Sequence, residues 1–573
     1  MDKKIAFITY ETPFAPGGGI AAVMAHLPQA LQEVSDIPTF VISPYHVNIA
    51  KTTNLESRMV TIDTIQIPFD LELFDLDIKL LDEEINWIFL KSKGNFHQVP
   101  SFFAGQRHPY DVDTIDGQSI LLRDSLFFGK AASLALPAIS QRCTWTILMQ
   151  DWEAATTILA LSDQANKKFP YSIYLTLHNS YDCGITDRDL VKIGLDPVNH
   201  PGDTIIECAL PLTRDPVFTV SEQFALDLST EILQSEIMIP HIVSELTPRL
   251  LGVNNGAFVK NSIPDEVYIP AVEGNYSPIH NWKTTNRKHA FAAIDKFSPS
   301  ESTPIWGDLQ RFDRGDAPWF VMAGRDDSRQ KGYELACIAV DQFLRKNEQA
   351  RFIFFPIPGD EGLPGIQFIR ELADKYPEQV LGFPFLFREG FFAVLRGATF
   401  GIMPSYYEPF GMANEYYLNG VGCIGRATGG ITQQIVPNRQ VSSFTPAVRR
   451  RADQWHLQTS PPTGLLFREQ DDIPNALEDW RQINAADYEI SSEKSNRLQQ
   501  RRKLLIIQSM ANELISCLQD ATQIYLTRQD LYYEMLINGI SYITENFSWE
   551  HTARTYHKFI HNEPNWNRDK NDT

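Results

Sequence analysis

One stretch constrains the fold of this chain more than any other: Met403-Pro404-Ser405-Tyr406-Tyr407-Glu408-Pro409-Phe410-Gly411. An apolar run, Ala398 to Met403, leads into it, and a periodic segment, Met412 to Leu418, follows it. This pattern predicts a buried strand, a tight turn and a helix. Open α/β sheets bind their ligands at the carboxyl ends of such strands. Glu408 is therefore a candidate site residue.

A second loop follows closely: Arg426-Ala427-Thr428-Gly429-Gly430-Ile431. Two glycines before an apolar segment allow a backbone to approach a phosphate at a helix N-terminus. One carboxylate and one anion-binding turn near each other in the sequence suit a ligand that is part sugar and part phosphate.

The pattern M-P-S-x-x-E-P-x-G followed by T-G-G-I resembles the nucleotide-sugar glycosyltransferases of the bacterial glycogen and plant starch synthase family. The resemblance implies a retaining enzyme of GT-B architecture, with two Rossmann-like α/β domains facing a cleft and a last helix that crosses back to the first domain. In that family the glutamate lies against the donor sugar and the glycine turn contacts the donor phosphates. These roles fall on Glu408 and on Thr428, Gly429 and Gly430. The alternative is that Glu408 only caps the following helix.

The start of the chain predicts the same kind of unit. Lys4 to Thr9 is predicted to be a buried strand, and a glycine-rich loop leads from it into a helix with Val23, Leu27, Ala30 and Leu31 on one face. Within the resemblance this loop assigns donor binding to Gly18 and Gly19; a simple tight turn is the alternative. The family writes P-x-x-K-x-G-G-L-x-D-V here. In this chain proline replaces the lysine and alanine replaces the aspartate, at Pro16 and Ala22.

Two further strand ends carry candidate site residues. Gln150-Asp151-Trp152-Glu153 follows an apolar strand and resembles the family's H-D-W-H, with Gln150 and Glu153 in place of the histidines. Glutamine can still hydrogen-bond a sugar hydroxyl, but it carries no charge. His178 follows another strand, as in the family's T-x-H-N. The resemblance makes Gln150 and His178 donor-binding residues; a lone strand-end histidine is otherwise more often structural.

The second half of the chain opens on a predicted strand, Trp319 to Gly324. The segment after it, Arg325-Asp326-Asp327-Ser328-Arg329-Gln330-Lys331-Gly332, resembles S-R-L-x-x-Q-K-G, where the arginine and lysine hold the donor diphosphate. These roles fall on Arg325 and Lys331, with one extra residue between them, and Arg329 could substitute for either. The alternative is a solvated charged turn.

Length and composition fit this organisation. A chain of 573 residues is too long for one core. We expect an N-terminal, acceptor-side domain at 1–262, a linker at 263–317, a nucleotide-sugar-binding domain at 318–540 with a helical insertion near 487–527, and a closing helix within 541–573. The resemblance has gaps at roughly 55–115, 260–315 and 485–535.

The net charge and the cysteine pattern of the chain exclude several classes of partner and site. A net charge of -20 disfavours nucleic acid or an anionic membrane as a general partner. The six cysteines are scattered, which is typical of a reduced, cytoplasmic protein, and no histidine or carboxylate pattern predicts a metal site. No apolar run reaches the roughly twenty residues of a membrane span. The resemblance likewise implies no metal and no cofactor beyond the sugar nucleotide.

These observations predict a retaining glycosyltransferase that moves a sugar, glucose by preference, from a nucleoside diphosphate sugar to a hydroxyl of a glucan, smaller glycan, metabolite or protein. A true α-1,4-glucan synthase using ADP- or UDP-glucose is one alternative, and a catalytically silent carbohydrate-binding relative is another. Glu408, Arg325 and Lys331 match the family's site residues, which argues against a catalytically silent protein. The departures at Pro16, Ala22, Gln150 and Glu153 favour a changed substrate and predict poor glycogen elongation from ADP-glucose.

Overall fold

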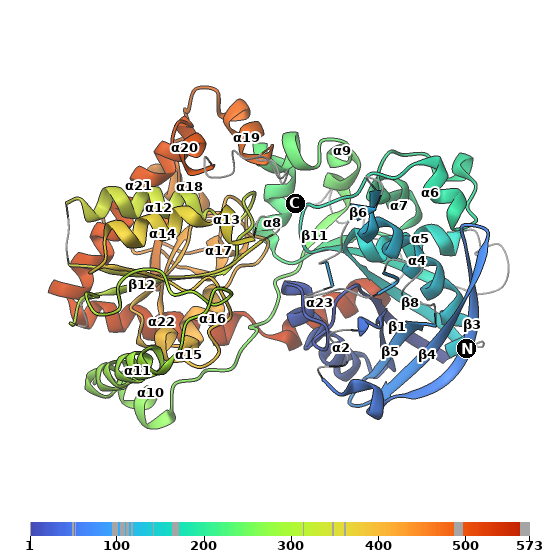
Figure 1. Ribbon diagram of the computed structural model, residues 1–573, viewed down its shortest axis with the longest axis horizontal. Helices are drawn as coiled ribbons and strands as arrows, with labels where there is room; N and C mark the ends of the chain where they lie inside the picture. Colours follow the sequence, from blue (N-terminus) through green and yellow to red (C-terminus); the bar gives the residue numbers. More distant parts are fainter. Residues whose placement is uncertain are drawn as a thin grey trace. The chain divides into compact units, whose positions relative to one another are not determined.

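The computed structural model describes residues 2–47, 51, 53–93, 101–103, 109–110, 114–115, 118–140, 143–162, 171–312, 315–346, 349–359, 362–485 and 497–561. The chain forms two compact α/β units (Figure 1). Unit 1 comprises Met1–Phe258 and Phe547–Thr573, and unit 2 comprises Val259–Asn546. Among the described residues, no helix combines the length and hydrophobicity that a membrane crossing requires.

Unit 1 is built on a nine-stranded sheet in the order β11-β10-β9-β8-β1-β2-β5-β4-β3. Strands β3 and β4, and β4 and β5, pair antiparallel, and the remaining neighbours pair parallel. The strands are β1 (Asp2–Ile8), β2 (Thr39–Pro44), β3 (Val60–Phe69), β4 (Glu72–Asp82), β5 (Asn86–Ser92), β8 (Cys143–Gln150), β9 (Tyr171–Leu177), β10 (Val217–Thr219) and β11 (Leu250–Gly252). The strand order reverses between β1 and β8, which makes this the switch point of the sheet.

The helix expected after the glycine-rich loop is two helices, with a break at Ala25 and His26 and a proline in the first turn of the second. The helices of unit 1 are α1 (Gly19–Met24), α2 (Leu27–Ser35), α4 (Ile120–Ile139), α5 (Asp151–Ser162), α6 (Asp187–Lys192), α7 (Ile205–Ala209), α8 (Glu222–Thr230), α9 (Val243–Leu246) and α23 (Trp549–His561). Helix α23 buries Ala553, Tyr556 and Ile560 in the same core as β1 and α2. The last residues of the closing segment, 562–573, lie outside the described ranges.

Unit 2 contains a six-stranded parallel sheet in the order β14-β13-β12-β15-β16-β17. Its strands are β12 (Trp319–Arg325), β13 (Arg351–Ile357), β14 (Val380–Gly382), β15 (Phe400–Met403), β16 (Gly422–Arg426) and β17 (Gly464–Phe467). Counted from β12, this is the order 3-2-1-4-5-6 of a Rossmann sheet, in which ligands bind where the order reverses. That switch point lies between β12 and β15, which are hydrogen-bonded neighbours.

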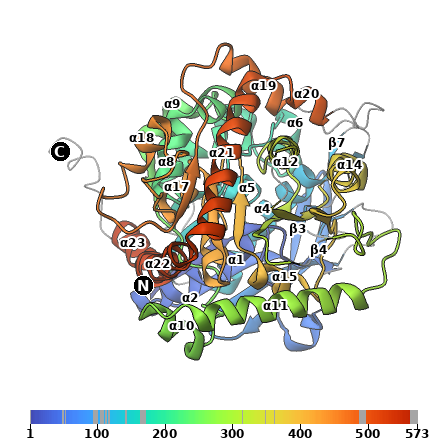
Figure 2. The same ribbon diagram turned by 90° about the vertical axis from the view of Figure 1, so that its left-hand side faces the viewer.

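Helices cover the sheet of unit 2, and the longest of them, α21, is drawn unbroken in Figure 2. They are α10 (Asp265–Val272), α11 (Ser277–Lys296), α12 (Tyr333–Leu344), α13 (Gly362–Gly365), α14 (Gln367–Lys375), α15 (Phe391–Gly397), α16 (Ala413–Leu418), α17 (Gly429–Gln434), α18 (Pro446–Ala452), α19 (Ala476–Asn484), α20 (Arg497–Arg501), α21 (Leu505–Thr527) and α22 (Gln529–Asn546). The helical region expected near 487–527 thus contains α20 and α21, while residues 486–496 lie outside the described ranges.

The structure differs from the linker expected at 263–317, because this segment belongs to unit 2 and contributes to its packing. The ammonium group of Lys283, on α11, is buried and donates to the carbonyl oxygens of Arg396, Ala398 and Gly420 at 3.2, 2.5 and 2.5 Å. Arg287, one turn later, donates to Gly397 O at 2.9 Å. Buried cations need such partners, so α11 is a fixed part of the unit.

Candidate functional site

The switch point of unit 2 brings together two turns that the sequence singled out. The turn after β12 ends at Lys331, and the turn after β15 contains Glu408. Lys331 Nζ lies 2.7 Å from Glu408 Oε2, and the two groups form an ion pair. The backbone N–H of Tyr406 donates to Gln330 O at 2.7 Å, which joins the turns a second time. Two candidate residues far apart in the sequence are thus in direct contact.

Glu408 is held by its own turn as well. The hydroxyl of Ser405 donates to Glu408 Oε2 at 2.9 Å, and Glu408 is 7% exposed. The residue at the N-cap of α16 is Met412, and among the described residues no side-chain hydrogen bond caps that helix. The carboxylate of Glu408 therefore does not act as the helix cap that the alternative interpretation required.

The glycine turn packs directly against the Glu408 turn. A Cβ atom on Gly429, whose φ is 44°, would lie 1.7 Å from Glu408 O, and one on Gly430 would lie 2.2 Å from Phe410 O. The N–H of Gly430 donates to Glu408 O at 3.1 Å, and the N–H of Thr428 donates to Arg426 O at 2.8 Å. The turn thus positions Glu408, and two of its N–H groups are engaged within the protein. Phosphate contact by Thr428, Gly429 and Gly430 stays a prediction.

The loop between β12 and α12 alternates in exposure. Asp326 and Ser328 are buried, whereas Arg325, Arg329 and Lys331 are partly exposed. Just before it, Gly324 has a φ of 130°, and a Cβ atom there would meet no atom within 4 Å. The loop therefore turns the carboxylate of Asp326 inward and leaves its cationic side chains partly exposed.

The glycine-rich loop of unit 1 encloses a carboxylate from its own chain. Glu11, directly after β1, is 2% exposed and accepts the N–H groups of Gly17 and Gly18 at 2.6 and 2.5 Å. Burial raises the pKa of Glu11, and these backbone hydrogen bonds partly offset the effect. The N–H of Gly18 is thus engaged by a protein carboxylate. Gly19 is exposed, and a Cβ atom there would meet nothing within 4 Å.

Two more carboxylates lie buried after β8, on the other side of the same switch point. Asp151 accepts the N–H of His178 at 2.6 Å and the amide of Asn179 at 2.7 Å. Burial raises the pKa of Asp151, and the charge of Glu11 raises it further. Burial and the charge of Asp151 raise the pKa of Glu153. Among the described residues, no group of three His, Cys, Asp or Glu side chains is placed to hold a metal ion.

The structure brings Gln150 and His178 into contact. His178 Nε2 and Gln150 Oε1 lie 2.7 Å apart, and since the amide oxygen only accepts, the histidine donates. Gln150 Nε2 donates to Leu148 O at 3.0 Å. Burial lowers the pKa of His178 to about 3, which keeps the ring neutral. Both residues belong to unit 1, together with Gly18 and Gly19, whereas the other candidates belong to unit 2.

Comparisons with known proteins show which proteins this chain resembles. A model of the starch synthase catalytic domain matches residues 4–237. The glycogen synthase of Rhodopirellula baltica is 23% identical over 456 residues, which cover 76% of this chain and 84% of the relative. The glycogen synthase of Natranaerobius thermophilus is 23% identical over 592 positions and 99% of each chain. These matches indicate a glycosyltransferase that is similar to the glycogen and starch synthases and divergent from them.

A solved structure supports the fold of this glycosyltransferase. The catalytic domain of starch synthase IV from Arabidopsis thaliana, bound to ADP and acarbose, has a TM-score of 0.66 at 18% identity. The match covers 97% of this chain and 98% of that one. The two α/β units are therefore those of the GT-B fold.

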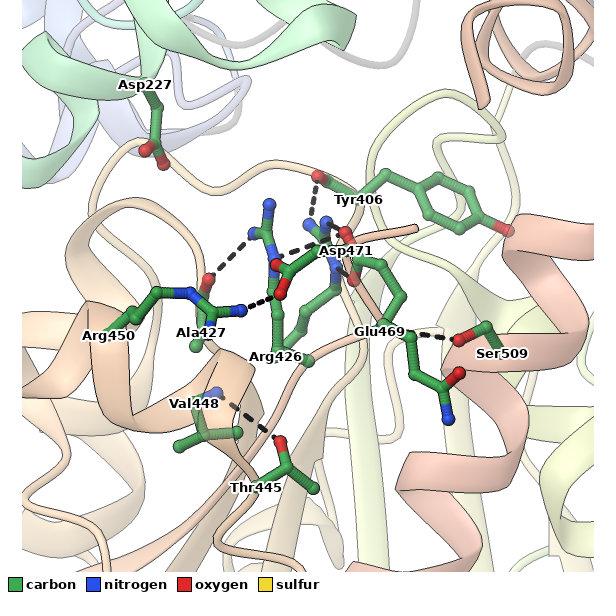
Figure 3. A network of polar contacts seen from close by, with 12 residues as sticks. Asp227, Tyr406, Arg426, Ala427, Thr445, Val448, Arg450, Glu469, Asp471 and Ser509 are labelled. Atoms are coloured by element: carbon green, nitrogen blue, oxygen red, sulfur yellow. Dashed lines mark hydrogen bonds and ion pairs between the residues drawn. The ribbon is translucent and has the colours of Figure 1, made fainter. Parts of the chain in front are cut away.

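The glycosyltransferase also contains a buried ion pair that sequence reasoning missed (Figure 3). Arg426, at the end of β16, is fully buried and donates through Nε to Glu469 Oε2 at 2.8 Å and through Nη1 to Tyr406 O at 2.6 Å. Burial alone raises the pKa of Glu469, but the charges of Arg426 and Arg468 lower it to about 2. The pair fixes the turn that carries Glu408. An arginine ending an otherwise apolar strand was the available signal.

A second carboxylate near the Lys331–Glu408 pair was also missed. Glu415 lies on α16, and burial raises its pKa to about 7. The positive charge of Lys331 lowers this pKa, and the negative charge of Glu408 raises it. Its place one turn into the helix gave no sign of these nearby charges, because helical periodicity shows which face a residue occupies but not what faces it.

Proposed function

We propose that this glycosyltransferase moves a hexosyl group, glucose in the first instance, from a nucleoside diphosphate sugar to a hydroxyl acceptor with retention of the anomeric configuration. The observation that carries the proposal is the ion pair between Lys331 and Glu408 at the switch point of unit 2. A cation suits the diphosphate, and a carboxylate beside it suits sugar hydroxyls.

The chemistry follows from these charges. When the bond between the anomeric carbon and the diphosphate breaks, the electron pair stays on a phosphate oxygen and the sugar becomes oxocarbenium-like. Arg325 and Lys331 are fixed positive groups that stabilise this leaving oxygen. Glu408 accepts hydrogen bonds from sugar hydroxyls and orients the ring. The acceptor oxygen then bonds to the anomeric carbon on the face that the diphosphate leaves, and its proton passes to the departing phosphate oxygen.

The nature of the leaving group draws support from the relatives. The starch synthase IV structure holds ADP, the nucleotide that transfer from ADP-glucose would release, and acarbose, an oligosaccharide analogue. For this chain we propose a nucleoside diphosphate as the product and leave the base open between adenine and uracil.

We further propose that the acceptor or donor differs from that of glycogen synthases. Pro16 and Ala22 cannot supply the charged contacts of the family's lysine and aspartate, and Gln150 and Glu153 replace two histidines. Losing one buried polar partner costs about 1–3 kcal/mol, or one to two decades in affinity. Glu153, whose pKa burial raises, places a carboxyl group where the family has histidine. Glycogen elongation from ADP-glucose should therefore be slow or absent.

The test is a donor panel followed by an acceptor panel. Purified protein is first screened for thermal stabilisation and hydrolysis with ADP-, UDP- and GDP-linked sugars. Labelled sugar transfer to glycogen, maltooligosaccharides and small hydroxyl compounds is then measured. Failure of every sugar nucleotide to bind would contradict the proposal. Robust elongation of glycogen from ADP-glucose, at rates of about 1–10³ s⁻¹ typical of enzymes, would instead identify a plain α-1,4-glucan synthase.

A further inference from the structure

Two departures from the family pattern meet in unit 2. The loop from Arg325 to Lys331 contains one residue more than the family's S-R-L-x-x-Q-K, and α20 lies in a region that the resemblance does not cover. The structure places the first arginine of α20 at the base of this loop. Arg497, 7% exposed, donates through Nη2 to both oxygens of Asp326 at 3.0 Å.

Arg497 also reaches the far end of the loop. Its Nε lies 2.6 Å from Glu334 Oε1, and Glu334 is fully buried in the first turn of α12. Asp326 directly follows Arg325, and Glu334 comes shortly after Lys331. One guanidinium therefore joins the two points at which the loop leaves β12 and enters α12.

A second arginine of α20 holds the middle of the loop. Arg501, 2% exposed, donates through Nη2 to Ser328 O at 3.0 Å and to Ile483 O at 2.9 Å. Its guanidinium lies 5.5 Å from the ring centre of Tyr406, in the turn that carries Glu408. The loop is thus fixed from one side by the Glu408 turn and from the other by α20.

The chemistry of these contacts explains why arginine is needed. Two buried carboxylates at the ends of one loop repel each other unless a cation lies between them. A guanidinium has several donors in a planar fork and can meet both carboxylates, whereas an ammonium group is a single point charge. A loop with an extra residue has more freedom, so it needs this additional restraint to keep one shape.

We propose that Arg497 and Arg501 are positioning residues of the donor site, which hold the lengthened loop so that Arg325 and Lys331 keep the spacing required by a diphosphate. The inference rests on the proposed function, because it assumes that this loop binds the donor. Helix α20 thus supplies the support that the longer loop requires.

The test compares Arg497→Lys and Arg501→Lys with Arg287→Lys in the full chain. Arg287 is a matched control because it is also a buried arginine of unit 2. Its partners precede β12 and β15, at the amino ends of the strands, whereas the loop from Arg325 to Lys331 lies at their carboxyl ends. Circular dichroism first establishes that each variant is folded. Calorimetry with ADP and UDP should show the dissociation constant rising about tenfold, or about 1.4 kcal/mol, in the two α20 variants and unchanged in the control.

Hydrogen exchange supplies a readout that does not depend on ligand. Amides of Arg329, Gln330 and Lys331, which are hydrogen-bonded within the loop, should exchange faster in Arg497→Lys and at the wild-type rate in Arg287→Lys. Unchanged exchange together with unchanged affinity in both α20 variants would overturn the positioning role. Equal losses in the control would also overturn it, because they would show general destabilisation.

A double variant separates this inference from the function on which it rests. If Arg497 acts through Lys331, Arg497→Lys should weaken ADP and UDP binding far less when Lys331→Ala is already present. Full additivity of the two effects would overturn the inference while leaving the donor site in place. Unchanged affinity in Lys331→Ala alone would instead remove the diphosphate from this loop, and would contradict both the proposed function and the positioning role.

Discussion

The two units share a strand order at their switch points but place opposite chemistry there. In unit 1, between β1 and β8, the groups are the carboxylates of Glu11, Asp151 and Glu153, and the glycine loop is closed on the first of them. In unit 2, between β12 and β15, Lys331 pairs with Glu408 near further cations. The topology determines where a ligand can bind, and the side chains determine its charge. We therefore expect the diphosphate of the proposed donor at unit 2, where the candidate cations lie.

The largest expected effect concerns Glu408. Glu408→Ala removes the carboxylate that we assign to the sugar in the transition state, and turnover should fall by about 10² or more while the protein stays folded. Steady-state kinetics with the donor found by the panel measures this. A kcat close to the wild-type value would show that Glu408 does not contact the sugar, and would contradict the difference that we draw between the two switch points.

The cations of unit 2 should affect binding rather than folding. Arg325→Ala and Lys331→Ala should each weaken nucleoside diphosphate binding by roughly 1.5–3 kcal/mol, because each removes a charged hydrogen bond. Isothermal calorimetry with ADP and UDP is the measurement. Unchanged affinity in both variants would move the phosphate site elsewhere, with Arg329 as the next candidate.

The two glycine turns should respond differently to a methyl group. Gly429→Ala places a Cβ atom 1.7 Å from Glu408 O at a φ of 44°, and should cost about 1–3 kcal/mol or more of unfolding free energy. Gly19→Ala meets nothing within 4 Å, and should change the unfolding free energy by no more than about 0.5 kcal/mol. Urea denaturation compares the two. Equal losses of unfolding free energy in the two variants would contradict the close packing that we describe at Gly429 and the open space at Gly19.

The two units should also differ in the pH dependence of their stability. Burial raises the pKa of Glu11, Asp151 and Glu153, so folded unit 1 binds more protons than the unfolded chain and loses stability as pH rises above about 4. In unit 2 the pKa of Glu469 is lowered to about 2, so that contribution is present at neutral pH and is lost as pH falls toward 2.

Buried thiols allow each unit to be followed separately. Cys143 lies in unit 1 and Cys517 in unit 2, and both are buried. After equilibration in urea at each pH, a brief labelling pulse at one fixed pH reports which thiol has become accessible. The Cys143 midpoint should fall as pH rises, and Glu153→Gln should flatten this slope while leaving the Cys517 midpoint unchanged. Parallel slopes in both units would contradict the assignment.

Much of the site's location could be predicted from the sequence, because the strand-turn-helix pattern around Glu408 is local. The contact between Lys331 and Glu408 follows once β12 and β15 are neighbours, since both turns then lie at one edge. The partners of the backbone N–H groups in the glycine-rich loop could not be predicted in this way. Glu11 lies only a few residues upstream of Gly17, and nothing in the pattern shows that its carboxylate folds back to accept these N–H groups.

The missed parts share a physical cause, which is burial of charge over long sequence separations. Arg287 and Lys283 look like surface residues of a polar helix, and the sequence therefore suggested a linker. Their backbone partners are oxygens at the end of α15 and in the segments before β12, β15 and β16, which no side-chain pattern reveals. The same holds for Arg497, whose partner Asp326 is 171 residues away. Buried cations are paired wherever they occur, but the sequence does not say with what.

The closing helix has a consequence for the order in which the chain folds during synthesis. Unit 2 is one continuous segment, Val259–Asn546, whereas unit 1 is completed only by the residues after it. The ring of Tyr556 stacks on Phe218 with centroids 4.3 Å apart, inside the core of unit 1. A nascent chain emerges from the ribosome N-terminus first. Unit 1 therefore begins to be synthesised first but is completed last. A chain whose synthesis stops before α23 would contain all of unit 2 joined to an incomplete unit 1.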